Sequence, residues 1–328
     1  MKTTKSIFLA TAVITLTIIT FIGATDKNAA SPEPFPKIPV EARQIAIYSP
    51  KIPESMEFCG ENVPLDKYYV RESLDREMIA NTFGHTSTIL YFKRAHRYFP
   101  IIEPILKKNG VPDDFKYLCV IESGLTNATS PAKAQGFWQF IKTTGQKYGL
   151  EISDEIDMRN NLEAATEAAC QFLKVLRRDL GSWTAAAAAY NCGAEGLSKN
   201  LEKQSIASYY DTRLNRETSR YIYRILAVKQ IMQHPQDYGF YLRPIDLYPT
   251  IPTRTTTLSG HNVDLYAFAK DNGCSYKLFR ELNPWITTEK LINKAGKSYT
   301  VKLPTADALS LRKLRTDRDK GTNFITKM

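Results

Sequence analysis

The stretch FKYLCVIESGLTNATSPAKAQGFWQF, residues 115–140, decides the fold of this chain. Apolar residues recur at helical spacing from Phe115 onward, which predicts an amphipathic helix heading into a core. This helix carries a carboxylate, Glu122, near its end, and Gly124 terminates it. Desolvation raises the pKa of a carboxyl group, as a general acid working near neutral pH requires. A lone glutamate at a helix end is usually a solvated surface group, so the surroundings of Glu122 must decide its role.

Three short motifs follow one another along the chain. The first is E-S at 122–123, with S-P-A-K-A-Q-G-F-W-Q-F starting at Ser130; the second is A-A-Y-N at 188–191; the third is E-T-S-R-Y at 217–221. In their order and spacing these motifs resemble those of family 1 lytic transglycosylases, in particular the membrane-bound D type. The resemblance implies a mainly α, goose-lysozyme-like catalytic domain that acts on peptidoglycan.

The resemblance also implies a reaction with a single acid and base. Protonated Glu122 would protonate the glycosidic oxygen between N-acetylmuramic acid and N-acetylglucosamine. The resulting carboxylate would take a proton from the muramoyl C6 hydroxyl, which attacks C1 and leaves a 1,6-anhydro end. This chemistry requires no metal and no cofactor. Glu217 is a second carboxylate, but its role in the family is supporting.

The same resemblance implies which residues bind the substrate. Ser130 would hydrogen-bond the glutamate or an N-acetyl group, Gln139 would offer a donor and an acceptor to a sugar amide, and Gly136 would let the backbone approach the sugar. Trp138 or Phe137 would provide a stacking floor for a sugar ring, an interpretation that competes with a place in the core. The residues expected to orient the glutamate or contact the saccharide are Tyr190, Asn191, Glu217 and Tyr221.

Two other functions remain compatible with these residues. A lysozyme-type hydrolase would use water in place of the C6 hydroxyl. A wall-binding protein without catalysis would use both of its domains as anchors, although the presence of Glu122, Tyr190 and Glu217 argues against it.

Composition narrows the class of partner. The 328 residues are 43% hydrophobic and 24% charged, which predicts two folded units with extensions rather than disorder. The formal net charge of +10 suits nucleic acid, an anionic membrane surface or an acidic polymer. Because the sequence has no zinc-finger spacing, RNA-binding aromatic motif or long basic helix, we favour peptidoglycan glycan strands and no nucleic acid.

The chain is expected to begin with an export signal, a spacer and the catalytic domain. Residues 1–24 have two lysines, an uncharged apolar run and a small-residue Gly-Ala pair, which predicts a secretory signal peptide. We therefore expect export to the periplasm, with membrane association through this segment left open. Residues 25–64 read as a Pro-rich spacer. Helical patterns fill a catalytic domain at 65–234, notably at 72–81, 87–98, 99–108, 162–180 and 213–233.

The C-terminal part predicts a small α+β domain. Residues 235–252 form a linker, and 253–304 read as strand, helix, helix and strand (βααβ), which resembles a LysM carbohydrate-binding module. Its first loop reads S-G-H-N-V-D where the usual module has a Gly-Asp-Thr turn, so the module is a degenerate, LysM-like one. Residues 305–328 are expected to be a solvated basic tail.

The cysteines indicate neither a metal site nor a disulfide framework. There are five, an odd number, without C-x-x-C spacing. Cys119, Cys170 and Cys192 lie in helical contexts and are expected to be small buried hydrophobes. One disulfide bridge stays open as an alternative in an oxidising compartment.

Overall fold

The computed structural model describes residues 48–315 and 324–328. The expected signal peptide at 1–24 lies outside the described residues, as do residues 25–47 of the expected spacer. No helix within the described ranges is long and apolar enough to cross a membrane.

Helices dominate the first part of the structure. It opens with a short antiparallel hairpin of β1 (Glu57–Phe58) and β2 (Glu61–Asn62). The helices that follow are α1 (Tyr68–Phe83), α2 (His85–Lys108), α3 (Phe115–Ser123), α4 (Lys142–Lys147), α5 (Leu162–Leu180), α6 (Trp183–Cys192), α7 (Ala194–Gln204) and α8 (Arg216–Gln233). Single 3-10 turns lie at Met158–Asn160, Tyr209–Asp211, Pro235–Tyr238 and Pro244–Asp246.

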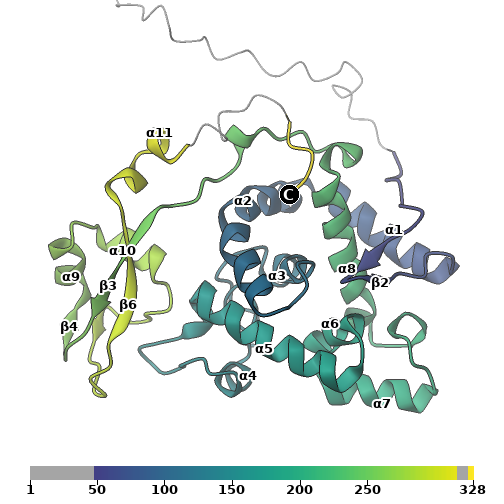
Figure 1. The fold of residues 1–328 in the computed structure, drawn as a ribbon, viewed down its shortest axis with the longest axis horizontal. Helices are drawn as coiled ribbons and strands as arrows, with labels where there is room; N and C mark the ends of the chain where they lie inside the picture. Colours follow the sequence, from purple (N-terminus) through teal and green to yellow (C-terminus); the bar gives the residue numbers. More distant parts are fainter. Residues whose placement is uncertain (1–47, 316–323) are drawn as a thin grey trace, which may run out of the picture. The chain divides into compact units, whose positions relative to one another are not determined.

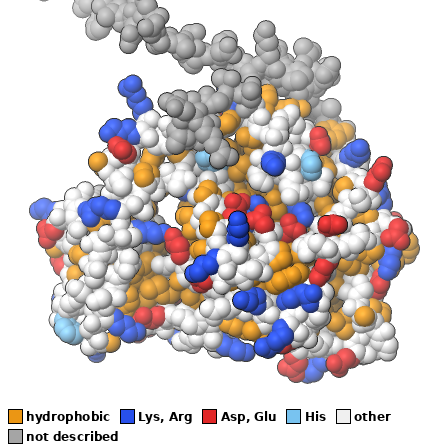
Figure 2. Space-filling model, in the orientation of Figure 1, with side chains coloured by type: hydrophobic (Ala, Val, Ile, Leu, Met, Phe, Trp, Pro, Cys, Tyr) orange, Lys and Arg blue, Asp and Glu red, His pale blue; other side chains and the backbone are white. Residues whose placement is uncertain are grey.

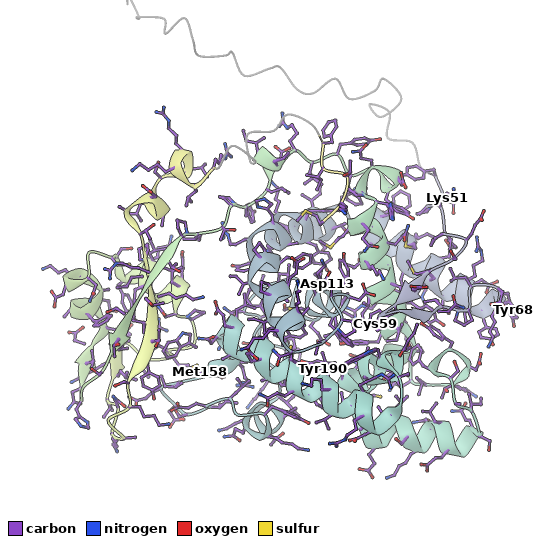
Figure 3. The ribbon with its side chains drawn as sticks, in the orientation of Figure 1. Lys51, Cys59, Tyr68, Asp113, Met158 and Tyr190 are labelled. Atoms are coloured by element: carbon purple, nitrogen blue, oxygen red, sulfur yellow. The ribbon has the colours of Figure 1, made fainter. Side chains whose placement is uncertain are left out.

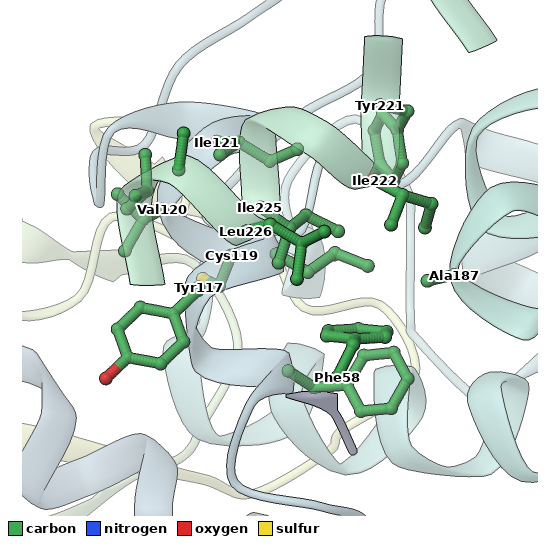
Figure 4. Close-up of a cluster of buried hydrophobic side chains, with 14 of the residues drawn as sticks. Phe58, Tyr117, Cys119, Val120, Ile121, Ala187, Tyr221, Ile222, Ile225 and Leu226 are labelled. Carbon is green, nitrogen blue, oxygen red and sulfur yellow. The ribbon is translucent and has the colours of Figure 1, made fainter. Parts of the chain in front are cut away.

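Helix α3 lies at the centre of this part, between α2 and α8 (Figure 1). Its first seven residues are all buried, and Gly124 ends it in the left-handed conformation. Figure 4 shows Cys119 and Ile121 of α3 in one apolar cluster with Ile225 of α8. The prediction that this helix heads into the core is therefore confirmed, but its first seven residues are buried on all faces rather than on one side.

Capping residues explain where the helices beside α3 begin. The Asn161 side chain accepts a hydrogen bond from the backbone N–H of Ala164 at the start of α5, and Gly181 ends α5. Ser182 caps α6 in the same way, through the N–H of Ala185. The expected helix at 162–180 is confirmed.

Helix α2 differs from expectation because it is continuous. The stretches 87–98 and 99–108 belong to one helix, with Pro100 and Pro104 inside it. Proline removes a backbone donor from a helix, which normally interrupts it. Apolar residues on both sides of Pro100, including Phe92 and Ile102, are buried in the same core, and this burial favours a single helix.

Part of the expected spacer belongs to the helical core. Met56, Phe58 and Val63 are buried there, and the Phe58 ring packs edge-on against Phe115 at 5.6 Å between centroids. The β1–β2 hairpin thus closes the base of α3. On the face shown in Figure 2, basic and acidic side chains are interspersed with apolar ones rather than gathered by sign.

The second part is the small α+β unit that the sequence predicts. Strand β3 (Thr253–Leu258) pairs antiparallel with β6 (Tyr299–Pro304), and α9 (Leu265–Asp271) and α10 (Tyr276–Leu282) lie between them in the chain. Before α9, Val263–Asp264 forms β4, which pairs with β5 (Lys290–Leu291) and adds a second two-stranded sheet to the expected βααβ order. The mainly α fold class with a small βααβ domain is confirmed.

The C-terminal tail is not wholly solvated, contrary to expectation. Beyond β6 it forms a 3-10 turn (Ala306–Leu309) and the short helix α11 (Leu311–Leu314). Its last residues return to the helical part, where the N–H of Ile325 donates to the carbonyl of Leu242. The N–H of Met328 donates to the carbonyl of Met232. Both apolar side chains pack against the first core, and this burial explains the return.

Candidate active site

Glu122 is the penultimate residue of α3, and it lines a cleft of about 630 Å³. The hydroxyl of Tyr221, on α8, donates a hydrogen bond to Oε1 of Glu122. Since α3 packs against α8, this contact is set by helix packing across 99 residues of sequence. The structure thus brings together the first and third motifs.

The surroundings of Glu122 make it a weak acid. Burial raises its pKa to about 7, and desolvation is the largest influence. The Tyr221 hydrogen bond and the positive charge of Arg224 lower the pKa, because both stabilise the carboxylate, whereas the negative charge of Glu217 raises it. At neutral pH the group is therefore populated in both protonation states, so it can give up a proton and take one back.

Tyr190 lines the cleft without contacting Glu122 through its hydroxyl. It lies near the end of α6 and is labelled in Figure 3. Its hydroxyl donates to the carbonyl oxygen of Trp138 at 2.7 Å, and its ring packs against Phe172 at 5.2 Å between centroids. The expectation that Tyr190 orients the glutamate directly is thus corrected: Tyr190 supports the wall of the cleft.

The expectation of a stacking floor at Trp138 or Phe137 is wrong. Trp138 is fully buried, and its indole N–H donates to the Thr166 hydroxyl at 2.8 Å. Phe137 is also buried and packs edge-on against Tyr98 at 4.7 Å between centroids. Neither side chain lines the cleft that holds Glu122. Trp138 belongs to the core, and Phe137 borders a separate pocket of about 590 Å³.

Glycine is required at position 136 for a reason other than the expected approach of the backbone to a sugar. Its φ is +80°, and a Cβ atom at this position would lie 1.9 Å from the carbonyl oxygen of Arg159. The absent side chain therefore makes room for the backbone of a neighbouring segment rather than for substrate.

Gln139 lines the cleft, but both of its amide hydrogens are already used. Its Nε2 donates to the carbonyl oxygens of Ala128 at 2.9 Å and Gly136 at 2.7 Å. The expected donor to a sugar amide is therefore absent, and the side chain can offer only its oxygen as an acceptor. Its main role is to brace the loop in which it lies.

Three more predicted residues line the cleft. Ser130 accepts a hydrogen bond from the N–H of Ala134 at 3.1 Å, which leaves its hydroxyl hydrogen available as a donor. Asn191 donates to Oε1 of Glu217 at 3.2 Å and accepts from the Thr218 hydroxyl at 2.9 Å. The second and third motifs are therefore linked by direct hydrogen bonds at the edge of the cleft.

The acidic loop at 154–157 lies outside the cleft. Asp157 is buried and paired with Arg159 at 2.6 Å. Arg159 in turn donates to the carbonyl oxygens of Lys133 at 3.0 Å and Phe140 at 3.1 Å, so the pair braces the loop that carries Gln139. The acidic side chains that line the described cleft are Glu122 and Glu217.

Some residues of the cleft were not predicted. Arg224 borders it, three residues after Tyr221 on the same face of α8, and its Nη2 donates to the carbonyl oxygen of Ile121 at 3.2 Å. The three-residue spacing from Tyr221 to Arg224 is visible in the sequence and could have identified Arg224 as a residue of the cleft. The other unpredicted lining residues come from four segments, and four of them lie inside the first two motifs: Ala132, Ala134, Phe140 and Ala189. No motif marks the remaining six, which are Ile121, Ile141, Thr144, Phe172, Cys192 and Gly193.

Comparison with known proteins adds two family matches. Residues 99–212 match the family described as Transglycosylase SLT domain. Residues 254–307 match the family described as Soluble lytic transglycosylase C-terminal LysM-like domain. The first match covers most of the helices around the cleft, including α3, and the second covers the βααβ unit.

Two curated relatives carry the same name. The chain is 30% identical over 183 residues to the Membrane-bound lytic murein transglycosylase D of Escherichia coli strain K12, which covers 54% of this chain and 40% of that protein. The same values hold for the protein of that name in Escherichia coli O6:H1 strain CFT073. The chain thus spans about two fifths of the length of these relatives.

Proposed function

This chain contains a transglycosylase SLT domain followed by a LysM-like domain, and from that premise we propose that it is a peptidoglycan lytic transglycosylase. It cleaves the β-1,4 bond between N-acetylmuramic acid and N-acetylglucosamine and leaves 1,6-anhydro-N-acetylmuramic acid ends. The observation that supports this most is Glu122, a carboxyl group with a pKa of about 7 on the wall of a cleft lined by all three motifs.

The proposed reaction uses Glu122 twice. Protonated Glu122 donates its proton to the glycosidic oxygen as the bond from that oxygen to muramoyl C1 breaks. The carboxylate then accepts the proton of the muramoyl C6 hydroxyl as its oxygen forms a bond to C1. Atoms and protons balance without water, and the carboxyl group returns to its starting state. Tyr221 holds Oε1, which leaves Oε2 to exchange the proton.

The geometry favours one acid and base over a pair. Glu217 lines the same cleft, but it is exposed and accepts a hydrogen bond from Asn191. Hydrolysis of the lysozyme type normally recruits a second carboxylate as nucleophile or base. In our proposal Glu217 has a supporting role: its charge raises the pKa of Glu122 and it ties α8 to α6.

A peptidoglycan substrate also requires export to the cell envelope. The expected signal at residues 1–24 is in keeping with this requirement, and the net charge of +10 suits a polymer that bears carboxylates. We therefore place the protein in the periplasm, with glycan strands as its partner.

The test is digestion of purified peptidoglycan by the wild type and by Glu122→Gln, with products identified by mass spectrometry. We expect wild-type products one water lighter than hydrolysed muropeptides, and a loss of about 10³-fold in rate for the variant. Glu72→Gln, at an exposed position of α1, is the matched control and should retain wild-type activity.

Each alternative has its own signature in this experiment. Products that carry the added water would indicate a hydrolase. An absence of products from the wild type, together with binding to the polymer, would indicate a wall-binding protein. Full activity of Glu122→Gln would remove Glu122 from the mechanism, provided that thermal unfolding shows both variants folded as the wild type is.

A further inference from the structure

A second hollow of about 430 Å³ adjoins the cleft. Its lining residues all belong to α8, and we call it the arginine pocket: Arg216, Glu217, Arg220 and Arg224. Glu217 and Arg224 border both the arginine pocket and the cleft that holds Glu122, so the two hollows are continuous at these residues. The proposed proton transfers involve neither Arg216 nor Arg220, the two lining residues that the cleft does not share.

The three arginines present one face of α8 because they are four residues apart. Two of them are held in place. The guanidinium group of Arg220 donates two hydrogen bonds to the buried carboxylate of Glu77, from Nε to Oε1 at 2.7 Å and from Nη2 to Oε2 at 3.0 Å. Arg224 is held by its hydrogen bond to the carbonyl oxygen of Ile121, at the end of the helix that carries Glu122.

Arg216 differs from the other two. It is exposed in the first turn of α8, and the salt bridges within residues 48–315 and 324–328 include no carboxylate partner for it. Among the described residues, the pocket therefore presents one guanidinium without a carboxylate partner beside two that are already positioned. Glu217, its lining carboxylate, accepts a hydrogen bond from Asn191, which partly satisfies it.

This arrangement suits a planar anion. A guanidinium group presents its N–H donors in a fork that matches the two oxygens of a carboxylate. Three guanidinium groups against the carboxylates of Glu217 and Glu77 leave the pocket with an excess of positive charge. The sugars of a glycan strand carry no charge when their amino groups are acetylated and every muramoyl carboxyl group is joined to a stem peptide. The stem peptides themselves carry free carboxylates.

We propose that the arginine pocket binds a free carboxylate of a peptidoglycan stem peptide, next to the glycosidic bond on which Glu122 acts. This inference rests on the proposed function, and it specifies the substrate as strands that bear acidic peptides. Binding the peptide here holds its muramoyl residue in register with Glu122. Arg216 is then a specificity residue, and its contribution is expected in KM more than in kcat.

The test compares soluble glycan strands that bear stem peptides with the same strands after their peptide carboxylates have been converted to primary amides. Release of anhydro ends gives kcat/KM for each substrate, and the ratio of the two values measures selectivity for the carboxylate. We expect the wild type to prefer the untreated strands about fivefold, a size typical of a partly exposed ion pair. Arg216→Gln should bring the ratio close to one, and Arg216→Lys should retain part of it.

Arg213→Gln is the matched control, because Arg213 is exposed just before α8 and does not line the pocket. It should keep the wild-type ratio. A wild-type ratio of one, or an unchanged ratio in Arg216→Gln, would overturn the inference while anhydro ends from both substrates would still uphold the proposed function. If the wild type released anhydro ends from neither substrate, the proposed function would fail and this inference with it.

Discussion

At Glu122 two opposing influences set the acidity of one side chain. Burial disfavours the carboxylate, while the Tyr221 hydroxyl and the charge of Arg224 favour it. The outcome, a pKa of about 7, suits a group that must act as acid and then as base at neutral pH. Activity that depends on protonated Glu122 should therefore decline as the pH rises above about 7.

Replacement of Tyr221 by phenylalanine should change the pH at which activity declines. The hydrogen bond of Tyr221 stabilises the carboxylate, so its loss raises the pKa of Glu122, and the alkaline limb of the pH–rate profile should shift to higher pH. We also expect kcat to fall about tenfold, because the carboxyl group loses the contact that orients it. The measurement is kcat/KM and kcat against pH from about 5 to 9.

Tyr190→Phe is the matched control for this prediction. Its hydroxyl donates to the carbonyl of Trp138 rather than to Glu122, so its removal should cost about 1 kcal/mol of stability and leave the position of the alkaline limb unchanged. A shift to lower pH in Tyr221→Phe, or equal shifts in both variants, would contradict the assigned roles.

Among the elements, the loop at 128–140 shows how a wall of the cleft is built from backbone contacts. Gln139 has a φ of +49° and bridges two carbonyl groups of the loop. Arg159 reaches two further carbonyls from outside it. The loop therefore has few remaining degrees of freedom, which suits a surface that must position a sugar.

Gly136→Ala should damage this loop. The added Cβ would lie 1.9 Å from the Arg159 carbonyl oxygen, and φ is +80°, so the backbone must move. We expect a loss of about 3 kcal/mol or more in the free energy of unfolding, measured by urea denaturation. Gly149→Ala separates the two causes, since φ there is +85° but no atom lies within 4 Å of the added Cβ.

The Gly149→Ala variant should lose only about 1–2 kcal/mol, the cost of a left-handed conformation alone. Similar losses of unfolding free energy in Gly136→Ala and Gly149→Ala would show that the contact with the Arg159 carbonyl oxygen does not contribute to the effect at Gly136.

For the molecule as a whole, the contact between the helical part and the LysM-like unit involves the acidic loop. Ile156 is buried in the core of the LysM-like unit, and the N–H of Asp157 donates to the carbonyl of Trp285 at 2.7 Å. The carboxylate of Glu155 accepts from the backbone N–H groups of Ile292 and Asn293. Since Asp157 also holds Arg159, the same segment reaches both the LysM-like unit and the cleft wall.

Glu155→Ala should weaken this connection. Two backbone donors would lose their charged acceptor, which costs about 1–3 kcal/mol. We expect limited proteolysis within 235–252 to become faster and the LysM-like unit to unfold at a lower temperature. Asp154→Ala, at an exposed neighbouring position, should behave as the wild type does. Equal protease sensitivity of the two variants would argue against a docking role for Glu155.

Much of the fold could be read from local patterns. Helical periodicity located α5 to the residue, and an apolar run before Gly124 located α3. Helix α7 was missed, because A-E-G-L-S-K-N-L-E-K-Q has few apolar positions and buries only Leu197. The continuity of α2 through two prolines was missed because it depends on burial against other helices.

The amino-acid sequence by itself determined the order of the three motifs, the helices that carry Glu122 and Tyr221, and the βααβ unit, since these follow from spacing along the chain. Only the tertiary structure decided that Trp138 is core, that the donors of Gln139 are already used, and that Tyr190 holds a loop rather than the acid. The physical reason is that burial and hydrogen-bond partners depend on residues distant in sequence, which local patterns do not specify.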